Sequence, residues 1–305
     1  MRIVCVFVLL VMADCGVVNS SPGVRTSLAD APVAVQRICD PLAKFGAPVP
    51  ILELAMVNAG APRLSGDELT IYFHVYGSQV DLWSAHRNSL TEPFGPPTLL
   101  AGQNSSSADY DPAVSADGLT LWFASTRVAN EGQHLYVSTR TSTLAEFGAP
   151  GLAAAVNATD TQQYDAQPFL TTVGNELWFT SKRTGGLGGN DIWRAAWTGS
   201  GFETPVAVAE LNSPADEWVP TVSADRLTVY FSSERAATGA KGDRDIWVSH
   251  RNVIDDGFPA STLVDELNTA GADVASWLSA DNCRMYGTSS GGGGTNRIYT
   301  ASRQP

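Results

Sequence analysis

Residues 112–123 read PAVSADGLTLWF, and close copies of this stretch recur along the chain. Its second half alternates apolar and polar residues as a half-buried β-strand does, and Ser-Ala-Asp-Gly is a tight-turn sequence. The other copies are PRLSGDELTIYF from Pro62, PFLTTVGNELWF from Pro168, PTVSADRLTVYF from Pro220 and SWLSADNCRMYG from Ser276. Five copies that start 50 to 56 residues apart predict one repetitive all-β domain.

Two more strand patterns follow each of the first four copies, and one follows the last. The nearer ones are DLWSAHR from Asp81, HLYVSTR from His134, DIWRAAW from Asp191, DIWVSHR from Asp245 and RIYTASR from Arg297. The farther ones are FGPPTLLAG from Phe94, FGAPGLAAAV from Phe147, FETPVAVAEL from Phe202 and FPASTLVDEL from Phe258. With the hairpin of the repeat itself, each unit has four antiparallel strands, which is the composition of a β-propeller blade. The sequence therefore predicts a five-bladed β-propeller.

The chain ends at Pro305, directly after the third strand of the last repeat, and a similar segment, FGAPVPILEL from Phe45, precedes the first repeat. We expect this segment to supply the outer strand of the last blade. Closing the ring in this way pairs backbone groups that would otherwise be left at an open junction. The predicted propeller spans residues 43–305.

The N-terminus has the form of an export signal. Arg2 precedes an apolar run from Ile3 to Ala13, which is too short to span a bilayer. We interpret residues 1–16 as a secretory signal and 17–42, rich in small residues and proline, as a tether. Cys15 also suggests a lipoprotein, although Asp14 stands where that signal needs a small residue. Periplasmic, cell-envelope or extracellular location follows.

Composition and charge narrow the function classes. Hydrophobic residues make up 44% of the chain and charged residues 16%, which is typical of a globular domain with a substantial core. The net charge of -12 opposes binding to nucleic acid and to anionic membranes. Beyond the export signal, no apolar run is long enough to form a transmembrane segment.

Cys39 and Cys283 are the two cysteines of the predicted exported domain, and both should lie where the two chain ends meet. An oxidising compartment permits a disulfide between them, and closing so long a loop would restrict the unfolded chain. Two separate buried thiols are the alternative.

The repeats resemble the WD40-like β-propeller repeat of TolB-type bacterial proteins over residues 45–303. DYDPAVSADGLTLWFASTR and EWVPTVSADRLTVYFSSER follow that pattern closely, and GGLGGNDIW resembles its glycine-rich loop. Blades 1 and 5 depart from it, because Gly77 and the run SSGGGG replace its arginine. The resemblance implies a monomeric scaffold that binds a cell-envelope protein or a small ligand, and it implies no activity.

One column of the repeats is acidic. Three residues before the aligned Pro or Ser stand Ala59, Asp109, Asp165, Glu217 and Asp273. We expect these four carboxylates to surround one mouth of the central channel, where they could bind calcium or a cationic ligand. The alternative is that each carboxylate accepts hydrogen bonds from nearby backbone. No other cofactor is predicted.

Three aromatic residues, Tyr110, Trp218 and Trp277, are expected near the same mouth, where they could stack on a sugar or peptide or pack between blades. A second recurrent feature pairs an arginine with the aspartate that begins the next strand. It predicts ion pairs between Arg183 and Asp191 and between Arg235 and Asp245.

Catalytic motifs are weak. GTSSG, residues 287–291, matches the hydrolase nucleophile pattern, but no histidine follows it; SADGLTLW lacks the spacing of a sialidase Asp-box. The four histidines show no metal-ligand spacing. The sequence therefore favours a binding scaffold that is not an enzyme. The alternative is a glycoside hydrolase that uses carboxylates in the central channel.

Overall fold

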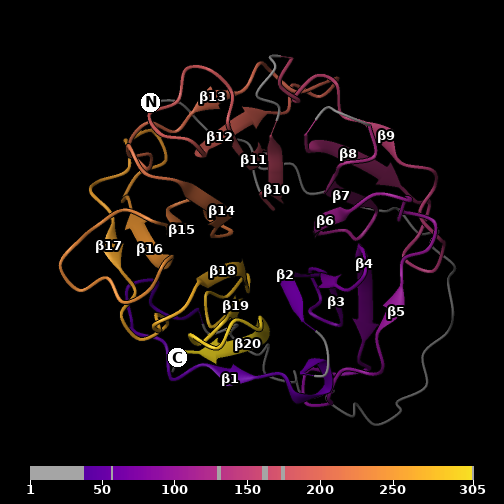
Figure 1. Cartoon of the computed structure of the whole chain (residues 1–305), viewed down its shortest axis with the longest axis horizontal. Helices are drawn as coiled ribbons and strands as arrows, with labels where there is room; N and C mark the ends of the chain where they lie inside the picture. The colour runs from indigo at the N-terminus through magenta and orange to yellow at the C-terminus, as the bar shows by residue number, and fades with distance from the viewer. Residues whose placement is uncertain (1–37, 56–57, 129–131, 160–163, 173–175, 304–305) are drawn as a thin grey trace, which may run out of the picture. The chain divides into compact units, whose positions relative to one another are not determined.

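The protein was analysed as a computed structural model that describes residues 38–55, 58–128, 132–159, 164–172 and 176–303. The predicted signal, residues 1–16, and the tether up to residue 37 lie outside the described residues. The described chain is all β, with five four-stranded antiparallel sheets standing around a common centre (Figure 1). The predicted five-bladed propeller is confirmed. Within these ranges no helix is long and apolar enough to cross a membrane.

The blades follow the repeats in order. Blade 1 contains β2 (Ala59–Leu64), β3 (Thr70–Tyr76), β4 (Val80–His86) and β5 (Thr98–Leu99). Blade 2 contains β6 (Asp109–Val114), β7 (Thr120–Ser125), β8 (His134–Thr139) and β9 (Gly151–Leu152). Blade 3 contains β10 (Asp165–Leu170), β11 (Glu176–Ser181), β12 (Asp191–Ala196) and β13 (Val206–Ala207). Blade 4 contains β14 (Glu217–Val222), β15 (Thr228–Ser233), β16 (Asp245–His250) and β17 (Thr262–Leu263).

Blade 5 is built from both ends of the propeller. It contains β18 (Asp273–Leu278), β19 (Arg284–Ser289), β20 (Arg297–Ser302) and, as its outer strand, β1 (Val49–Pro50), which is followed by a 3-10 turn, η1 (Leu52–Leu54). β1 pairs antiparallel with β20, with Val49 opposite Thr300 (Figure 1). The predicted ring closure is confirmed. Each outer strand is only two residues long, shorter than the segments predicted for it.

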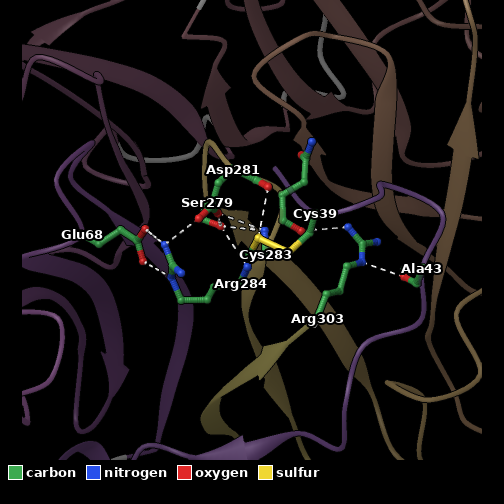
Figure 2. Close-up of a disulfide and its surroundings, with 9 residues drawn as sticks. Cys39, Ala43, Glu68, Ser279, Asp281, Cys283, Arg284 and Arg303 are labelled. Carbon is green, nitrogen blue, oxygen red and sulfur yellow. Dashed lines mark hydrogen bonds and ion pairs between the residues drawn. A yellow bond between two sulfur atoms is a disulfide. The ribbon is translucent and has the colours of Figure 1, made fainter. Parts of the chain in front are cut away.

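The predicted disulfide is confirmed and lies at this closure. Cys39 and Cys283 are bonded, and the Cys39 N–H donates to the carbonyl of Asp281 over 2.8 Å (Figure 2). Beside it, Arg303 donates to the carbonyls of Pro41 and Ala43. The described residues 38–42, expected to belong to the tether, are therefore part of the propeller.

The turn between the two inner strands explains the Ser-x-Asp sequence of four of the five repeats. In blade 2 the Ser115 hydroxyl donates to Asp117, and the Asp117 carboxylate accepts the Leu119 N–H over 3.0 Å. Gly118 has φ +72°, a conformation that glycine adopts without strain. These local bonds hold the turn that joins the two inner strands.

The innermost strand of every blade is bulged. In β6 the register shifts between Tyr110 and Ala113, and the residue at the bulge, Asp111, has φ +54°. The equivalent residues of blades 1, 3 and 4 are Ala61, Gln167 and Val219, with φ between +48° and +56°. Positive φ is unusual for a residue other than glycine, and above all for β-branched valine. Bulges re-aim side chains, and here they face the central channel.

Apolar side chains fill the space between neighbouring blades. One cluster joins Trp122 and Leu135 of blade 2 to Phe179 and Trp193 of blade 3. Equivalent clusters recur around the ring. The core is therefore a series of blade interfaces, and the central channel is lined by a mixture of small apolar, polar and charged residues.

Candidate functional site in the central channel

The acidic column begins the innermost strands, as predicted, but its side chains are fully buried within their own blades. Asp109 accepts the Ser105 N–H over 2.6 Å and an Arg127 guanidinium N–H over 2.8 Å. Asp165 accepts the Ala158 N–H and an Arg183 N–H, both over 2.6 Å. Each carboxylate thus ties the loop before the inner strand to the end of the second strand.

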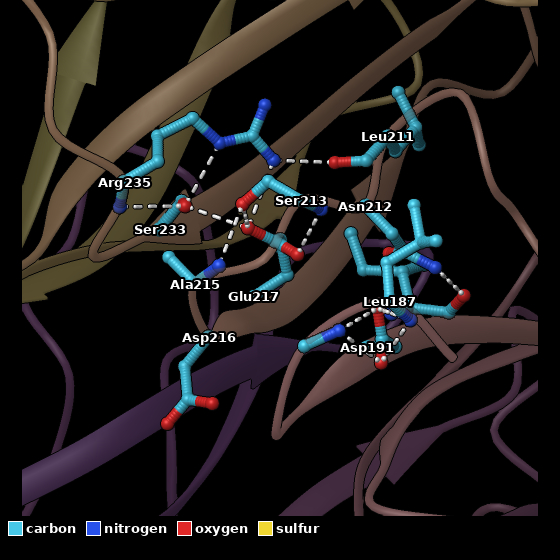
Figure 3. A network of polar contacts seen from close by, with 12 residues as sticks. Leu187, Asp191, Leu211, Asn212, Ser213, Ala215, Asp216, Glu217, Ser233 and Arg235 are labelled. Carbon is cyan, nitrogen blue, oxygen red and sulfur yellow. Dashed lines mark hydrogen bonds and ion pairs between the residues drawn. The ribbon is translucent and has the colours of Figure 1, made fainter. Parts of the chain in front are cut away.

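Glu217 forms the same kind of anchor (Figure 3). It accepts the N–H and hydroxyl of Ser213 over 2.7 and 2.6 Å, the Ser233 hydroxyl over 2.8 Å, and lies 2.9 Å from Arg235. Burial raises the pKa of Glu217, and these hydrogen bonds and the arginine lower it. In blade 5 Thr269 caps Asp273, and Gly291 stands where blades 2–4 have the arginine. Blade 1 lacks both partners, with Ala59 and Gly77.

The predicted pairs between Arg183 and Asp191 and between Arg235 and Asp245 are wrong. Both arginines turn back to the acid at the start of the innermost strand. Asp191 instead accepts the Leu187 N–H over 3.1 Å, and Asp245 accepts the Lys241 N–H over 2.9 Å. These two aspartates accept hydrogen bonds from the loop that precedes their own strand. Their carboxylates are therefore not paired with the arginines.

The structure does not bring the four acids of the column together. No group of three or more His, Cys, Asp or Glu side chains among the described residues could hold a metal ion. Their hydrogen bonds fit the alternative, in which each carboxylate anchors nearby backbone.

The anchors make a stability prediction. Glu217→Gln removes the charge that neutralises Arg235, and breaking a buried pair costs about 3 kcal/mol. At 2–4 °C per kcal/mol, the melting temperature should fall by about 6–12 °C, equally with and without calcium. Asp243→Asn is the control, because Asp243 is an exposed acid of the same region. A calcium-dependent rise in the melting temperature of the unmodified protein that Glu217→Gln abolishes would instead establish a cation site.

The carboxylate that does face the channel is Asp111, at the bulge of β6. It lines a cavity of about 100 Å³, here called the channel pocket. The other lining residues are Gly60, Ala61, His74, Tyr76, Gln167, Val219, Arg244, Ala272, Val274, Thr288 and Asn296. Asp111 is the one acid among the described residues that line it. A cavity of this size can take a single small group such as the end of one sugar.

Hydrogen bonds around the channel fix these side chains. The Asp111 N–H donates to His74 Nδ1 over 3.1 Å, and the Val219 N–H donates to Gln167 Oε1 over 3.1 Å. The Gln167 backbone N–H also bonds to the Asp111 carboxylate. The bulged residues of blades 2, 3 and 4 are therefore each held by a side chain from the preceding blade, which stabilises the strained backbone.

His74 is held as a neutral ring. Burial lowers the pKa of His74 to about 3, so it is uncharged at neutral pH. Because Nδ1 accepts a hydrogen bond, the proton is on Nε2, which has no hydrogen-bond partner among the described residues. A Cβ atom on Gly60 would lie 2.3 Å from Nε2, so only glycine leaves room for the ring. The Nε2–H is therefore a buried donor that packs against Gly60 and is not open to the pocket.

Arg63 closes the other side of the pocket. It is 3% exposed, donates to Thr221 over 3.1 Å and to the carbonyl of Ser276, and lies over the Phe169 ring. Burial lowers the pKa of Arg63 to about 9, and nearby Asp111 opposes that shift. Because it reaches from blade 1 to blades 4 and 5, this side chain crosses the channel.

Asp111 is correspondingly a weak acid. Burial raises the pKa of Asp111 to about 6, although Arg63 and the Gln167 N–H favour the ionised form. A carboxyl group with this pKa holds its proton in mildly acidic solution and can donate it. This is the only chemistry that the described geometry of the pocket offers directly.

Four aromatic side chains lie in or beside the channel pocket. This aromatic rim consists of Tyr76, which lines the pocket, and of Tyr110, Tyr164 and Trp218 next to it. Tyr76 is 39% exposed, and Arg244 stacks on Trp218 at 4.3 Å from the ring centre. Burial raises the pKa of Tyr76 to about 12, with Asp111 and Tyr110 acting in the same direction. The rim offers uncharged hydroxyl groups and ring faces.

Two of the three predicted aromatic residues, Tyr110 and Trp218, lie at this mouth. Trp277 does not. It lines a separate cavity with Arg63 and Phe169, beyond the point where Arg63 crosses the channel. Trp277 lies three residues farther along its strand than Tyr110 and Trp218 do along theirs, and this places it toward the opposite end of the channel.

Asp111, Arg63 and His74 were missed as site residues, although the repeats contain a signal for them. The column that precedes the aligned Pro or Ser reads Ala61, Asp111, Gln167, Val219 and Ala275, so it holds a single acid. Arg63 is likewise the single charge in the column that follows. A search for residues that recur in every repeat finds those that stabilise each blade. A binding or catalytic site in a ring of repeats is formed instead where one copy differs from the others.

Comparisons with known proteins bear on the fold. No family model matches the chain, and no curated protein sequence matches it. Among solved structures, an α-L-arabinofuranosidase from Podospora anserina is 11% identical, with TM-score 0.55, over 87% of this chain and 98% of that one. An α-L-arabinofuranosidase from Lactobacillus brevis is 10% identical, with TM-score 0.53, over 83% and 94%. A putative TolB from Agrobacterium tumefaciens is 16% identical, with TM-score 0.46, over 79% and 73%.

These likenesses show the propeller fold alone. They nevertheless correct the expectation of a non-catalytic binding scaffold, because structures of the same fold include several glycoside hydrolases. The propeller fold therefore does not favour a scaffold over an enzyme, and membership of the WD40-like family is not established.

Proposed function

We propose that the protein is a glycoside hydrolase that acts in the central channel, with Asp111 as the proton donor. The observation that carries the proposal is a buried carboxyl group at the bottom of an aromatic-lined mouth, with a pKa raised to about 6. Glycoside cleavage needs an acid that protonates the leaving oxygen, and a raised pKa is the usual property of that acid.

The rest of the pocket supports binding of a sugar. The aromatic rim provides faces on which a sugar ring can stack. Most glycosidases use a second carboxylate to activate water or to attack the sugar. Asp111 is the one acid lining the described pocket, so the proposal assigns proton donation to this chain and leaves the attack to water.

We further propose that the protein is exported and acts as a monomer on a small saccharide. The basic start and short apolar run of residues 2–13 support export, as does the disulfide between Cys39 and Cys283. The small size of the pocket supports removal of a terminal sugar rather than cleavage inside a polymer.

The test is hydrolysis of a set of 4-nitrophenyl glycosides that includes the α-L-arabinofuranoside and the β-D-xyloside. We expect release of nitrophenol from at least one of them. Since only protonated Asp111 can donate, kcat/KM should fall as the pH rises through about 6. Absence of hydrolysis across the set, or activity that increases through this pH range, would contradict the proposal.

A further inference from the structure

Four of the five blades share a clamp at their edges, on the opposite ends of the strands from the acidic column. The residue after the third strand is an arginine whose guanidinium lies over the phenylalanine that precedes the outer strand. The pairs and ring distances are Arg87 on Phe94 (4.4 Å), Arg140 on Phe147 (4.3 Å), Arg251 on Phe258 (4.3 Å) and Arg303 on Phe45 (3.9 Å). Each arginine also donates to a carbonyl of the turn in its own blade.

Blade 3 breaks this rule. Trp197 stands where the other blades have the arginine, and its ring packs on Phe202 at 5.0 Å between centres. Phe202 in turn packs edge-on against Trp122 of blade 2 at 5.5 Å. Trp197 is 41% exposed. An aromatic surface therefore lies open where a cation covers it in four other places.

A groove of about 560 Å³ lies at this point between blades 2 and 3, here called the inter-blade groove. Its lining residues are Thr120, Trp122, Val137, Thr139, Leu152, Ala153, Ala154, Ala155, Val156, Leu170, Thr171, Trp197 and Phe202. None of these residues is charged. The volume is within the usual range for small-molecule sites, which are mostly apolar with a few polar groups.

The neighbouring interface is charged at the equivalent positions. The space between blades 3 and 4 has a volume of about 460 Å³ and is lined by Glu176, Arg194, Glu210 and Arg251 among others. The inter-blade groove has Thr120, Val137, Ala155 and Trp197 at these four positions. Thr120 also lies opposite Thr139, whereas in blades 1 and 4 the equivalent threonine bonds to a histidine. Several exchanges together therefore leave this groove without a charged lining residue among those described.

We propose that the inter-blade groove is a second binding site, which takes an uncharged molecule with a flat aromatic or apolar ring. A charged ligand would lose its hydration without finding an opposite charge there. A ring can stack on Trp197 and displace water from the apolar wall formed by Leu152 and Val156. This site uses no residue of the channel pocket, so it is independent of the proposed hydrolysis.

The test uses the uncharged dye N-phenyl-1-naphthylamine, whose fluorescence rises in an apolar site. We expect saturable binding with one site per chain. Trp197→Arg restores the arginine of the other blades and should weaken binding at least about tenfold, whereas Trp197→Phe should keep most of it. Leu144→Arg is the matched control, because Leu144 is 97% exposed and lies outside the groove.

Ala154→Asp provides a second variant if Trp197→Arg does not fold. Ala154 is exposed and lines the groove, so the change adds a charge without touching the aromatic residues. Loss of dye binding with either folded variant, together with unchanged binding by Leu144→Arg, supports the site. Non-saturable binding to the unmodified protein, or equal affinity in the folded groove variants, would overturn it.

Discussion

Replacing Asp111 by asparagine is expected to reduce kcat/KM for a glycoside with an unactivated leaving group by about a hundredfold to ten-thousandfold. Asparagine has no proton to donate to the leaving oxygen. It keeps a carbonyl oxygen that can accept the Gln167 N–H, so the ring of hydrogen bonds around the channel should survive. Kinetics with the unmodified protein and the variant at pH 5 measure the effect.

The leaving group tells a catalytic role from a structural one. A 2,4-dinitrophenyl glycoside leaves without protonation, so Asp111→Asn should retain most activity on it. A general loss of structure would reduce both activities alike. Asp109→Asn is the control: Asp109 precedes Asp111 by two residues but is bonded to Arg127 and buried away from the pocket. It should lower stability and leave both activities in place below its melting temperature.

The free energy of unfolding should change little in Asp111→Asn, because of the raised pKa of Asp111. A folded-state pKa raised to about 6 means that the fold favours the neutral carboxyl. Stability in the unmodified protein should therefore be lost as the pH rises from the unfolded pKa through about 6. The neutral asparagine removes that pH dependence. An Asp111→Asn protein that melts far below the unmodified protein at pH 7 would show that the ionised form supports the fold.

The repeats made the fold predictable because each blade must satisfy the same structural requirements. Every copy must pair strands and bury an apolar face against the next blade, so the alternating strands and the Ser-x-Asp turn recur. Closure by β1 was predictable for the same reason. The last repeat lacks a fourth strand, and an additional strand of the same kind precedes the first repeat. The short outer strands were not, because a two-residue pairing such as Thr98–Leu99 leaves little trace in sequence.

The site was less predictable because recurrence indicates structure. Asp165 and Glu217 recur with Arg183 and Arg235, and each pair proves to be an anchor. The prediction that each arginine pairs with the next aspartate in the sequence was wrong. The arginine side chain instead turns back toward the acid at the start of the innermost strand. An acid occurs only once in the column of Asp111. The alternation of apolar and polar residues in the strand does not indicate that a bulge points this side chain toward the channel. That fact depends on a positive φ, which local sequence other than glycine rarely reveals.

Breaking the disulfide between Cys39 and Cys283 is expected to destabilise the propeller by about 5 kcal/mol, because the bond closes a loop with a sequence separation of 244 residues. Cys39→Ala, Cys283→Ala and the double variant should all melt about 10–20 °C below the unmodified protein. Thermal unfolding without reductant, followed by circular dichroism, measures this. Reductant should bring the unmodified protein down to the level of the variants.

The double-mutant cycle distinguishes a disulfide from two independent thiols. Either single change cuts the same bond, so the double variant should lose little more than each single one. Independent thiols would instead give two smaller losses that add. The closure would still be held by β1 against β20 and by Arg303, which donates to Pro41 and stacks on Phe45. Folding should therefore survive in the variants. Because strand pairing and Arg303 act in the folded state while the disulfide mainly restricts the unfolded chain, the two contributions should be separable: Arg303→Ala should destabilise the reduced and oxidised proteins equally.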